Sequence, residues 1–389
     1  MKISFVLIST GLTGGVRYIF EVANGLKNKG HDVKILSLAG DHSWFKGLKV
    51  EVIYKEPKFN KINNILYKLF QLYAYLRYDS NIKIKPYDFL LSSALRLGIK
   101  SDVIYELAEF IQNFSSDVMV ATYYLTAFSV LLSNNYSKPF YLMQDFPELV
   151  ESNEGTIELK RFLLSLKLPF SFVAVSNYLR QLILDNNPSA KVVVAHPGVD
   201  LNIFRPRKKH YENDKKKKVM IILRGDKYKG DEITIKTLND INKKIPVHAI
   251  IVGRKKLINS YLKTIGINFK FSSFFNVDDE TLAKLYSTSD AFLYTSYAEG
   301  FGLPPLEAMA CGTPVVMTDN KGSRDYAING YNALIADAGD TKTLVDYLAK
   351  VLQDDKLREK LIENGLETAK KFTWSSTVDR FEKVLREDF

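Results

Sequence analysis

Short apolar runs rich in β-branched residues recur along the chain, separated by glycines and by stretches with helical periodicity. Such continuous runs are typical of strands that are buried on both faces of a parallel sheet. A first series lies at 3–8, 33–36, 118–122, 140–143, 172–175 and 192–195, and a second lies at 219–223, 249–252, 291–294, 314–317 and 333–335. Because strands and helices alternate in each series, the pattern predicts an α/β fold with two doubly wound domains.

A polar run at 207–218 interrupts the pattern between the two series. It ends in four consecutive lysines and has no apolar periodicity, so it is predicted to be a linker. A phosphate-binding patch is the alternative interpretation of the lysines. The predicted domains are therefore 1–206 and 219–372, and a last amphipathic helix at 373–389, which opens with Trp374, follows them. A chain of 389 residues is long enough for two such domains.

The composition excludes several classes of protein. The single cysteine, Cys311, rules out an internal disulfide and a cysteine-based zinc site, and it suits a reducing cytoplasm. No stretch approaches the roughly 20 consecutive apolar residues that a membrane-spanning helix needs. The first apolar run leads into a glycine-rich turn rather than a cleavage site, so we expect a buried strand and not a signal peptide. The expected location is the cytoplasm.

The net charge of +10 is concentrated in one segment. Residues 55–100 hold nine Lys and Arg against three Asp and Glu, together with eight Phe and Tyr. This mixture is typical of a segment that binds an anionic membrane surface. It fits equally well a helical insertion that packs on the domain and exposes a basic face to solvent. A peripheral contact of residues 60–86 with an anionic membrane is therefore one hypothesis. Nucleic acid is not expected as a partner, because no recognition motif accompanies the charge.

The first apolar run ends in a turn that contains Gly11, Gly14 and Gly15 and leads into a helical pattern. Glycines let the backbone approach a ligand, and the N-terminus of the following helix favours an anion. The spacing differs from the dinucleotide fingerprint, and no acidic residue closes the second run near Ile35, which argues against a dehydrogenase. The turn alone fits a ligand loop and a packing turn equally well.

A parallel feature follows the first strand of the second series, where Arg224 and Lys229 lie in one short loop. Arginine supplies a rigid fork and lysine a mobile point charge, which are complementary ways of holding a diphosphate. The C-terminal ends of strands are also where open α/β sheets bind ligands. On these two residues alone, solvated surface charge is the simpler interpretation.

The block at 296–316 favours a diphosphate-binding role for Arg224 and Lys229 over solvated surface charge. Glu299 lies in a glycine-rich loop, and Glu307 lies eight positions later on a predicted helix that begins with prolines. Bare backbone N–H groups in such a loop, and the partial positive charge at a helix N-terminus, favour a phosphate. Glu307 could then accept hydrogen bonds from ribose hydroxyls while Glu299 faces the sugar.

This block resembles the signature of the retaining glycosyltransferases of family 4, in which two glutamates flank seven residues. Further matches in the same order extend the resemblance over the whole chain: Gly14-Gly15, Gly30-His31-Asp32-Val33, Val175-Ser176-Asn177-Tyr178, Pro197-Gly198-Val199-Asp200, Phe204-Arg205-Pro206, Val252-Gly253-Arg254 and Leu285-Tyr286-Ser287-Thr288-Ser289-Asp290. The resemblance implies the GT-B fold, with two facing Rossmann-like domains and a donor cleft between them. The C-terminal domain would hold the donor and the N-terminal domain the acceptor, with the last helix crossing back to the first domain.

The same resemblance implies roles for individual residues. Arg224 and Lys229 would stabilise the charge that develops on the leaving diphosphate, and Glu299 would orient the donor sugar or stabilise oxocarbenium character. Transfer would retain the anomeric configuration without a metal, and the absence of an Asp-x-Asp triplet agrees with this. The donor-binding residues would be Gly14, Gly15, Gly300, Phe301, Gly302, Leu303, Glu307, Arg254, Asn276 and Val277.

The chain departs from the family pattern near the reacting sugar. Many members have a histidine in the loop after a mid-domain strand, where this chain reads Met143-Gln144-Asp145, and none of its five histidines falls there. Asp145 is a candidate for orienting the acceptor or taking its proton, or alternatively for capping the next segment. The turn also resembles a subgroup that uses deoxythymidine diphosphate rhamnose, which is a hint about the donor. His196 is expected to be structural.

The sequence therefore predicts a hexosyltransferase that moves a hexose or deoxyhexose from a nucleotide diphosphate sugar to a glycan or lipid-linked acceptor in polysaccharide or glycoconjugate biosynthesis. No cofactor and no metal are expected. Two alternatives remain: a nucleotide-sugar-processing enzyme, such as an epimerase, on the same fold, and a non-catalytic binding subunit on a transferase scaffold. The presence of both glutamates and both cations argues against the second alternative.

Overall fold

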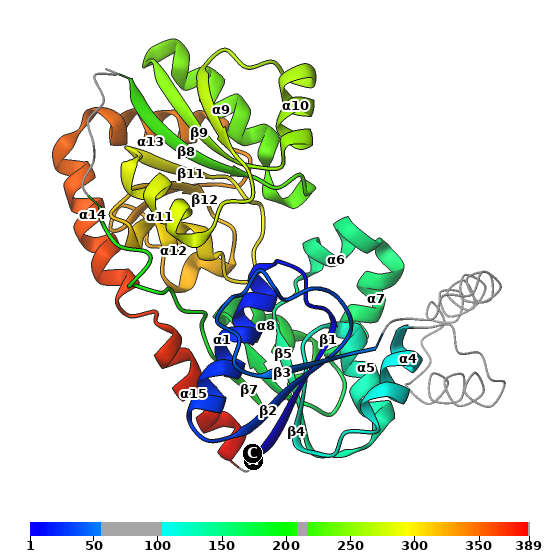
Figure 1. The fold of residues 1–389 in the computed structure, drawn as a ribbon. Coiled ribbons are helices and arrows are strands. Elements are labelled where there is room, and N and C mark those ends of the chain that lie inside the picture. The colour runs from blue at the N-terminus through cyan, green and yellow to red at the C-terminus, as the bar shows by residue number, and fades with distance from the viewer. Residues whose placement is uncertain (56–102, 208–215, 388–389) are drawn as a thin grey trace. The chain divides into compact units, whose positions relative to one another are not determined.

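The computed structural model describes residues 1–55, 103–207 and 216–387, which Figure 1 draws in colour. Nearly all of the basic aromatic segment and most of the predicted linker lie outside the described residues, so the membrane hypothesis and the predicted domain limits remain predictions. The chain forms two compact units. The first comprises Met1–Ala174, Leu182–Val193 and Phe381–Phe389, and the second comprises Val175–Gln181 and Val194–Arg380.

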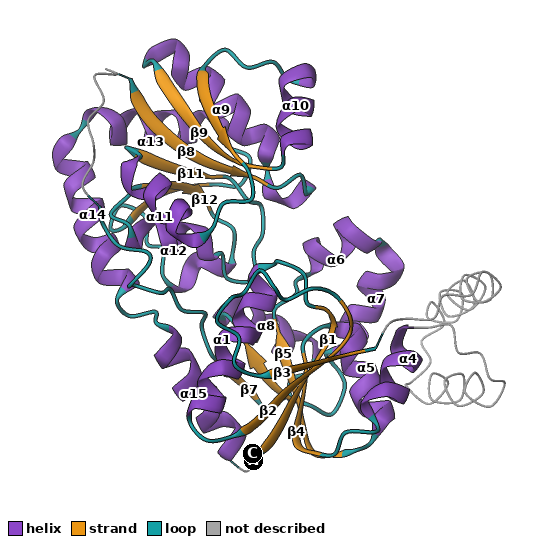
Figure 2. Cartoon of the chain, viewed as in Figure 1, coloured by secondary structure: helices purple, strands orange, loops and turns teal. Residues whose placement is uncertain are grey.

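Strands and helices alternate along both units (Figure 2). The strands are β1 (Lys2–Ser9), β2 (Asp32–Ala39), β3 (Glu51–Tyr54), β4 (Ser116–Ala121), β5 (Tyr136–Met143), β6 (Ser171–Ala174), β7 (Val192–Val194), β8 (Lys217–Leu223), β9 (Val247–Gly253), β10 (Lys270–Phe274), β11 (Ala291–Tyr294), β12 (Val315–Thr318) and β13 (Ala333–Ala336). The helices are α1 (Gly14–Asn28), α4 (Val103–Ile111), α5 (Tyr124–Ser133), α6 (Pro147–Glu154), α7 (Thr156–Ser165), α8 (Asn177–Asn186), α9 (Asp231–Lys244), α10 (Lys255–Thr264), α11 (Asp279–Thr288), α12 (Leu303–Ala310), α13 (Thr341–Gln353), α14 (Asp355–Ala369) and α15 (Trp374–Arg386), with short 3₁₀ turns η1 (Lys227–Lys229) and η2 (Gly322–Asp325). Within the described ranges, no helix is long and apolar enough to cross a membrane.

Each unit is built on a parallel sheet with the same strand order. The first sheet runs β3-β2-β1-β4-β5-β6-β7 and the second runs β10-β9-β8-β11-β12-β13. In the first sheet, Ile3 of β1 pairs with Val33 of β2 and with Val118 of β4. The strand order reverses between β1 and β4 and between β8 and β11, and such switch points are where open α/β sheets bind ligands. The predicted fold, two doubly wound Rossmann-like units, is confirmed.

Every strand predicted from an apolar run is present, and two strands, β3 and β10, were not predicted. Both are edge strands, one at the end of each sheet. Their residues are half-buried or exposed rather than fully buried. The edge strands at the other ends of the sheets, β7 and β13, were predicted from apolar runs, so edge position alone does not hide a strand. In β10 the polar residues Ser272 and Ser273 interrupt the apolar run.

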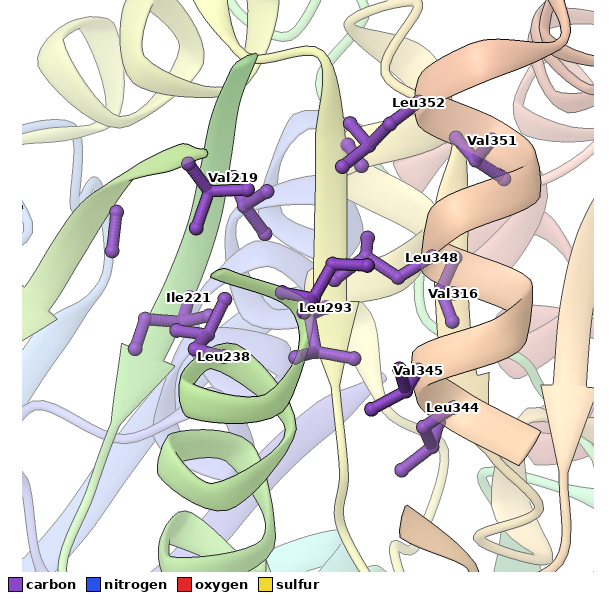
Figure 3. Packing of buried hydrophobic residues seen from close by; sticks show 14 of the residues in the cluster. Val219, Ile221, Leu238, Leu293, Val316, Leu344, Val345, Leu348, Val351 and Leu352 are labelled. Carbon is purple, nitrogen blue, oxygen red and sulfur yellow. The ribbon is translucent and has the colours of Figure 1, made fainter. Parts of the chain in front are cut away.

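Burial on both faces explains the continuous apolar runs of the central strands. Val219 of β8 lies in a buried cluster with Leu238 of α9 and Leu348 of α13 (Figure 3). The next residue of the strand, Met220, points to the opposite face and is also fully buried. Helices therefore cover β8 on both faces, as the sequence pattern requires.

Helix α15 begins in the second unit, and its last residues belong to the first. Gly198 allows the start of α15 to lie directly against the backbone at residue 198. A Cβ at this position would be 2.2 Å from the Trp374 backbone nitrogen. Within the first unit, Phe381 packs against Phe5 and Tyr18, with ring centroids 5.9 and 6.5 Å away. Glycine at 198 is thus required by a close approach of two backbone segments.

Truncation of the buried cluster tests this packing. Leu348→Ala should lower the free energy of unfolding by about 2–5 kcal/mol, because it removes buried methyl groups and leaves a cavity. Lys342→Ala, at an exposed position of the same helix, should change it by less than about 0.5 kcal/mol. Urea denaturation of both variants measures the difference. Equal effects of the two substitutions would contradict the packing described.

Candidate active site

The loops that follow β8 and β11 meet at the switch point of the second sheet. Gly230 has φ +67°, and a Cβ there would lie 2.2 Å from the Thr295 carbonyl oxygen. The Thr295 hydroxyl donates to the Gly230 carbonyl at 2.9 Å, and the Tyr297 N–H donates to the Tyr228 carbonyl at 2.8 Å. A glycine at 230 therefore lets the two loops lie directly against each other.

Lys229 and Glu299 form an ion pair across these loops. The ammonium nitrogen lies 2.8 and 2.9 Å from the two carboxylate oxygens, and the side chains are only 19% and 9% exposed. The Tyr294 hydroxyl donates to the same carboxylate. Burial, reinforced by the charge of Glu299, holds the pKa of Tyr294 well above its ordinary value, so the phenol remains a hydrogen-bond donor.

Asp231 fixes the loop that carries Arg224. Its Oδ2 accepts the backbone N–H groups of Arg224 at 3.0 Å and Gly225 at 2.8 Å, while burial raises its pKa. The Arg254 guanidinium donates to the Arg224 carbonyl at 2.6 Å. The backbone of Arg224 is thus held from two sides although the residue itself is exposed. The predicted residues Arg224 and Arg254 are therefore in contact.

The second glutamate of the motif lies on α12. Gly302, with φ +83°, precedes this helix, and no side chain caps its N-terminus. Pro304 in the first turn has no N–H, so the amides of the preceding glycine-containing loop are the donors suited to an anion. Glu307 is buried and accepts a hydrogen bond from the Tyr286 hydroxyl at 3.3 Å.

The side chain of Phe301 anchors the loop between the two glutamates. Its ring lies 5.8 Å from His196, 5.1 Å from Tyr326 and 5.9 Å from Phe372, centroid to centroid, and it is buried. His196 Nε2 lies 2.8 Å from an oxygen of Asp325. Phe301 can therefore offer a ligand only its backbone, and the packing of His196 agrees with the structural role expected for it.

Asn276 and Val277 lie in a different connection, between β10 and α11. Asn276 is exposed and adopts a left-handed conformation with φ +49°, and Val277 is half-buried. Their placement beside a nucleotide base remains a prediction.

In the first unit, the predicted residues lie at the C-terminal ends of β1 and β5. Helix α1 begins at Gly14, and a Cβ at Gly15 would lie 3.2 Å from Gln144 Oε1. The next residue, Asp145, is buried, and its Oδ2 has no hydrogen-bond partner among the described residues. Burial, and secondarily the charge of Glu154, raise the pKa of Asp145 to about 8. At neutral pH this carboxyl is therefore mainly protonated and can donate a hydrogen bond.

Asp231 and Tyr294 are parts of the site that sequence reasoning missed. Asp231 carries a weak signal, because an acidic residue directly after a glycine suits the first turn of a helix. Tyr294 closes an apolar strand and is indistinguishable in sequence from a core residue. Its contact with Glu299 depends on the loop returning over the strand end, which the pattern does not encode.

Solved glycosyltransferases share this fold. The structure of HepE from Anabaena in complex with UDP-glucose matches 99% of both chains with a TM-score of 0.73 and 16% sequence identity. The likeness shows that the chain has the GT-B fold, in agreement with the strand order of its two sheets.

Sequence comparison finds similarity to known proteins over part of the chain. Residues 202–368 match the model of the glycosyl transferases group 1. The chain is 41% identical over 100 residues to O-antigen chain mannosyltransferase B of Escherichia coli, 26% of each protein. It is 24% identical over 329 residues, 79% of this chain and 86% of the other, to N,N'-diacetylbacillosaminyl-diphospho-undecaprenol alpha-1,3-N-acetylgalactosaminyltransferase of Campylobacter jejuni. Three of the curated relatives are matched over only 26%, 51% and 59% of their own length.

Protonated Asp145 predicts a pH dependence of stability. The pKa of about 8 in the folded protein exceeds the ordinary value of 3.8, so between these values the folded state holds a proton that the unfolded chain has lost. Its contribution is fully present below about pH 4 and falls by about 1.4 kcal/mol per pH unit as the pH rises towards 8.

Urea denaturation between pH 5 and 8 measures this contribution. Asp145→Asn should flatten the decline of stability with pH relative to the wild type, because the amide does not titrate. Asp117→Asn, at an exposed position of the same unit, serves as the control and should follow the wild-type slope. Parallel slopes for all three proteins would show that Asp145 is ionised in the folded state.

Proposed function

We propose that this chain is a retaining glycosyltransferase of family 4 that transfers a hexose or deoxyhexose from a nucleotide diphosphate sugar to a glycan or lipid-linked acceptor. The observation that carries the proposal is the Lys229–Glu299 pair at the switch point of β8 and β11. Arg224, in the loop after β8, and Glu307, on α12, belong to the same unit. This point lies within the segment that matches the group 1 glycosyltransferases. The UDP-glucose complex of HepE supports a nucleotide sugar as donor.

The chemical problem is the diphosphate leaving group, whose negative charge grows in the transition state. The Arg224 guanidinium and the Lys229 ammonium would meet this charge, together with the amides of residues 300–303. A bound diphosphate would draw Lys229 away from Glu299. Glu299, still held by Tyr294, would then accept a hydrogen bond from a sugar hydroxyl or stabilise positive charge at the anomeric carbon.

Glu307 would hold the nucleoside. A buried carboxylate needs hydrogen-bond donors, and a ribose offers two vicinal hydroxyls. The Tyr286 hydroxyl donates to one oxygen of Glu307, and its pKa is raised well above the ordinary value, chiefly by burial and next by the charge of Glu307. This phenol would thus keep the carboxylate in place while the ribose binds.

The first unit would receive the acceptor. Asp145 lies at the C-terminal end of β5 with an unpartnered oxygen, and its protonated carboxyl suits orienting an acceptor or sugar oxygen by donating a hydrogen bond. The name of the Campylobacter relative refers to a diphospho-undecaprenol sugar, which supports a lipid-linked acceptor and a place in polysaccharide or glycoconjugate biosynthesis. Deoxythymidine diphosphate rhamnose is one candidate for the donor, and a screen of nucleotide sugars would identify it.

The proposed reaction needs no metal. The two cations of the site, Arg224 and Lys229, would supply the charge stabilisation. Turnover is therefore expected to persist in EDTA. Proton NMR of the product should show the anomeric configuration of the donor. Loss of turnover in EDTA, or an inverted product, would contradict these two parts of the proposal.

A thermal-shift screen of nucleoside diphosphates and nucleotide sugars tests the donor site. A ligand that binds only the folded state must raise Tm, by an amount equivalent to about 2.7 kcal/mol at a hundredfold excess over Kd. Glu307→Gln should lose most of the shift, because the amide removes the charged acceptor for ribose hydroxyls. Glu359→Gln, at an exposed position of α14, should keep the shift. If no diphosphate nucleotide shifts the wild type, the proposed function fails.

A further inference from the structure

The turn after β12 contains a residue with a side chain in a rarely populated conformation. Lys321 has φ +67° and ψ −60°, and the Gly322 N–H donates to the Asn320 carbonyl at 2.8 Å. This combination defines a γ-turn of the rare positive-φ form, which is strained for any residue that has a Cβ. Strain of this kind persists only where the surrounding structure determines the backbone.

The turn lies directly against the backbone of Glu299. The Glu299 N–H donates to the Asn320 carbonyl at 2.9 Å, and Glu299 pairs with Lys321 as an isolated parallel bridge. A Cβ at Gly322 would lie 2.4 Å from the Glu299 carbonyl oxygen and 2.7 Å from the carbonyl carbon of Gly300. The turn is therefore the support on which the backbone of Glu299 lies.

The side chain of Lys321 ties the turn to a second element. Its ammonium lies 5.5 Å from the centroid of the Tyr178 ring, a distance at which a cation is attracted to the ring face. Tyr178 follows Asn177, whose N–H donates to Asp325 at 2.7 Å at the end of η2. The start of α8 thus contacts both ends of the segment 321–325, through the ammonium at one end and Asp325 at the other.

Glycine adopts positive φ without strain, so the backbone alone gives no reason for lysine at 321. What lysine has and glycine lacks is the side chain that reaches Tyr178. We propose that Lys321 is a positioning residue for Glu299: its ammonium, held on the Tyr178 ring, keeps the strained turn in the one conformation that supports the carboxylate. The inference rests on the proposed function, in which Glu299 faces the donor sugar.

The variant Lys321→Gly distinguishes the effect of the turn conformation from the effect of the lysine side chain. Glycine can still adopt the turn conformation and does so without strain, so Tm should be equal to that of the wild type or a few degrees higher. Without the tether the turn can relax, and kcat should fall roughly ten- to a hundredfold, as expected for a displaced reacting group. UDP affinity, measured by isothermal titration calorimetry, should stay within about twofold, because Glu299 does not hold the nucleotide. Turnover is measured with the nucleotide sugar found in the screen.

Four further variants control this experiment. Lys321→Arg retains a cation for the ring and should recover most of kcat. Tyr178→Leu should reproduce the loss, and the double variant with Lys321→Gly should be no worse than either single one. Asn134→Gly places glycine at another positive-φ position, φ +46° at the end of α5, and should leave kcat unchanged.

The outcomes separate the two proposals. Wild-type kcat in Lys321→Gly, or additive losses in the double variant, would overturn the positioning role. A parallel fall of Tm, UDP affinity and kcat would also overturn it, because it would indicate general damage to the second unit. If the wild type binds UDP and turns over a nucleotide sugar, any of these results counts against the positioning role alone. A wild type that binds no nucleoside diphosphate would defeat the proposed function and this inference with it.

Discussion

The ammonium of Lys229 and the carboxylate of Glu299 lie in hydrogen-bond contact, nearly shielded from solvent, across the loops that follow β8 and β11. Such a pair adds little to stability, because the loss of hydration offsets most of the attraction between the charges. Removal of either partner is nevertheless destabilising, because it leaves the other as an unpaired buried charge. The pair is therefore better suited to exchanging each member's partner for a group of a bound ligand than to stabilising the fold. An incoming diphosphate can take Lys229, and a sugar hydroxyl can take Glu299, without leaving either charge unmatched. The remainder of the site holds these two groups where that exchange can occur.

The two units offer different chemistry at the C-terminal ends of their strands. In the second unit, Arg224 and Lys229 follow the first strand and suit a polyanion. In the first unit, the buried carboxyl of Asp145 lies near the charge of Glu154, which itself accepts the hydroxyls of Tyr123 and Tyr124. Carboxyls and phenols suit hydroxyl-rich ligands rather than phosphates. This contrast is the reason for proposing that the second unit binds a nucleotide diphosphate and the first a sugar acceptor.

Sequence reasoning predicted both sheets and the polar residues of the second switch point, because continuous apolar runs and an uncommon glutamate spacing are local features. It missed the edge strands β3 and β10, which lack full burial. It also missed the contacts that organise the site, such as Asp231 on the Arg224 loop and Tyr294 on Glu299, since these depend on how loops return over strand ends. Gly230 and Gly322 were visible in the sequence, but only the backbone approaches to Thr295 and Glu299 show why no side chain fits there.

A crystal structure of the protein with UDP would show directly whether a diphosphate takes Lys229 from Glu299. We expect the diphosphate to lie beyond the C-terminal ends of β8 and β11, within hydrogen-bond distance of Lys229 Nζ. The Lys229–Glu299 contact should be lengthened or broken, and the ribose hydroxyls should be bonded to Glu307. UDP bound elsewhere on the second unit, with the ion pair unchanged from its present 2.8 Å, would contradict the proposed exchange of partners.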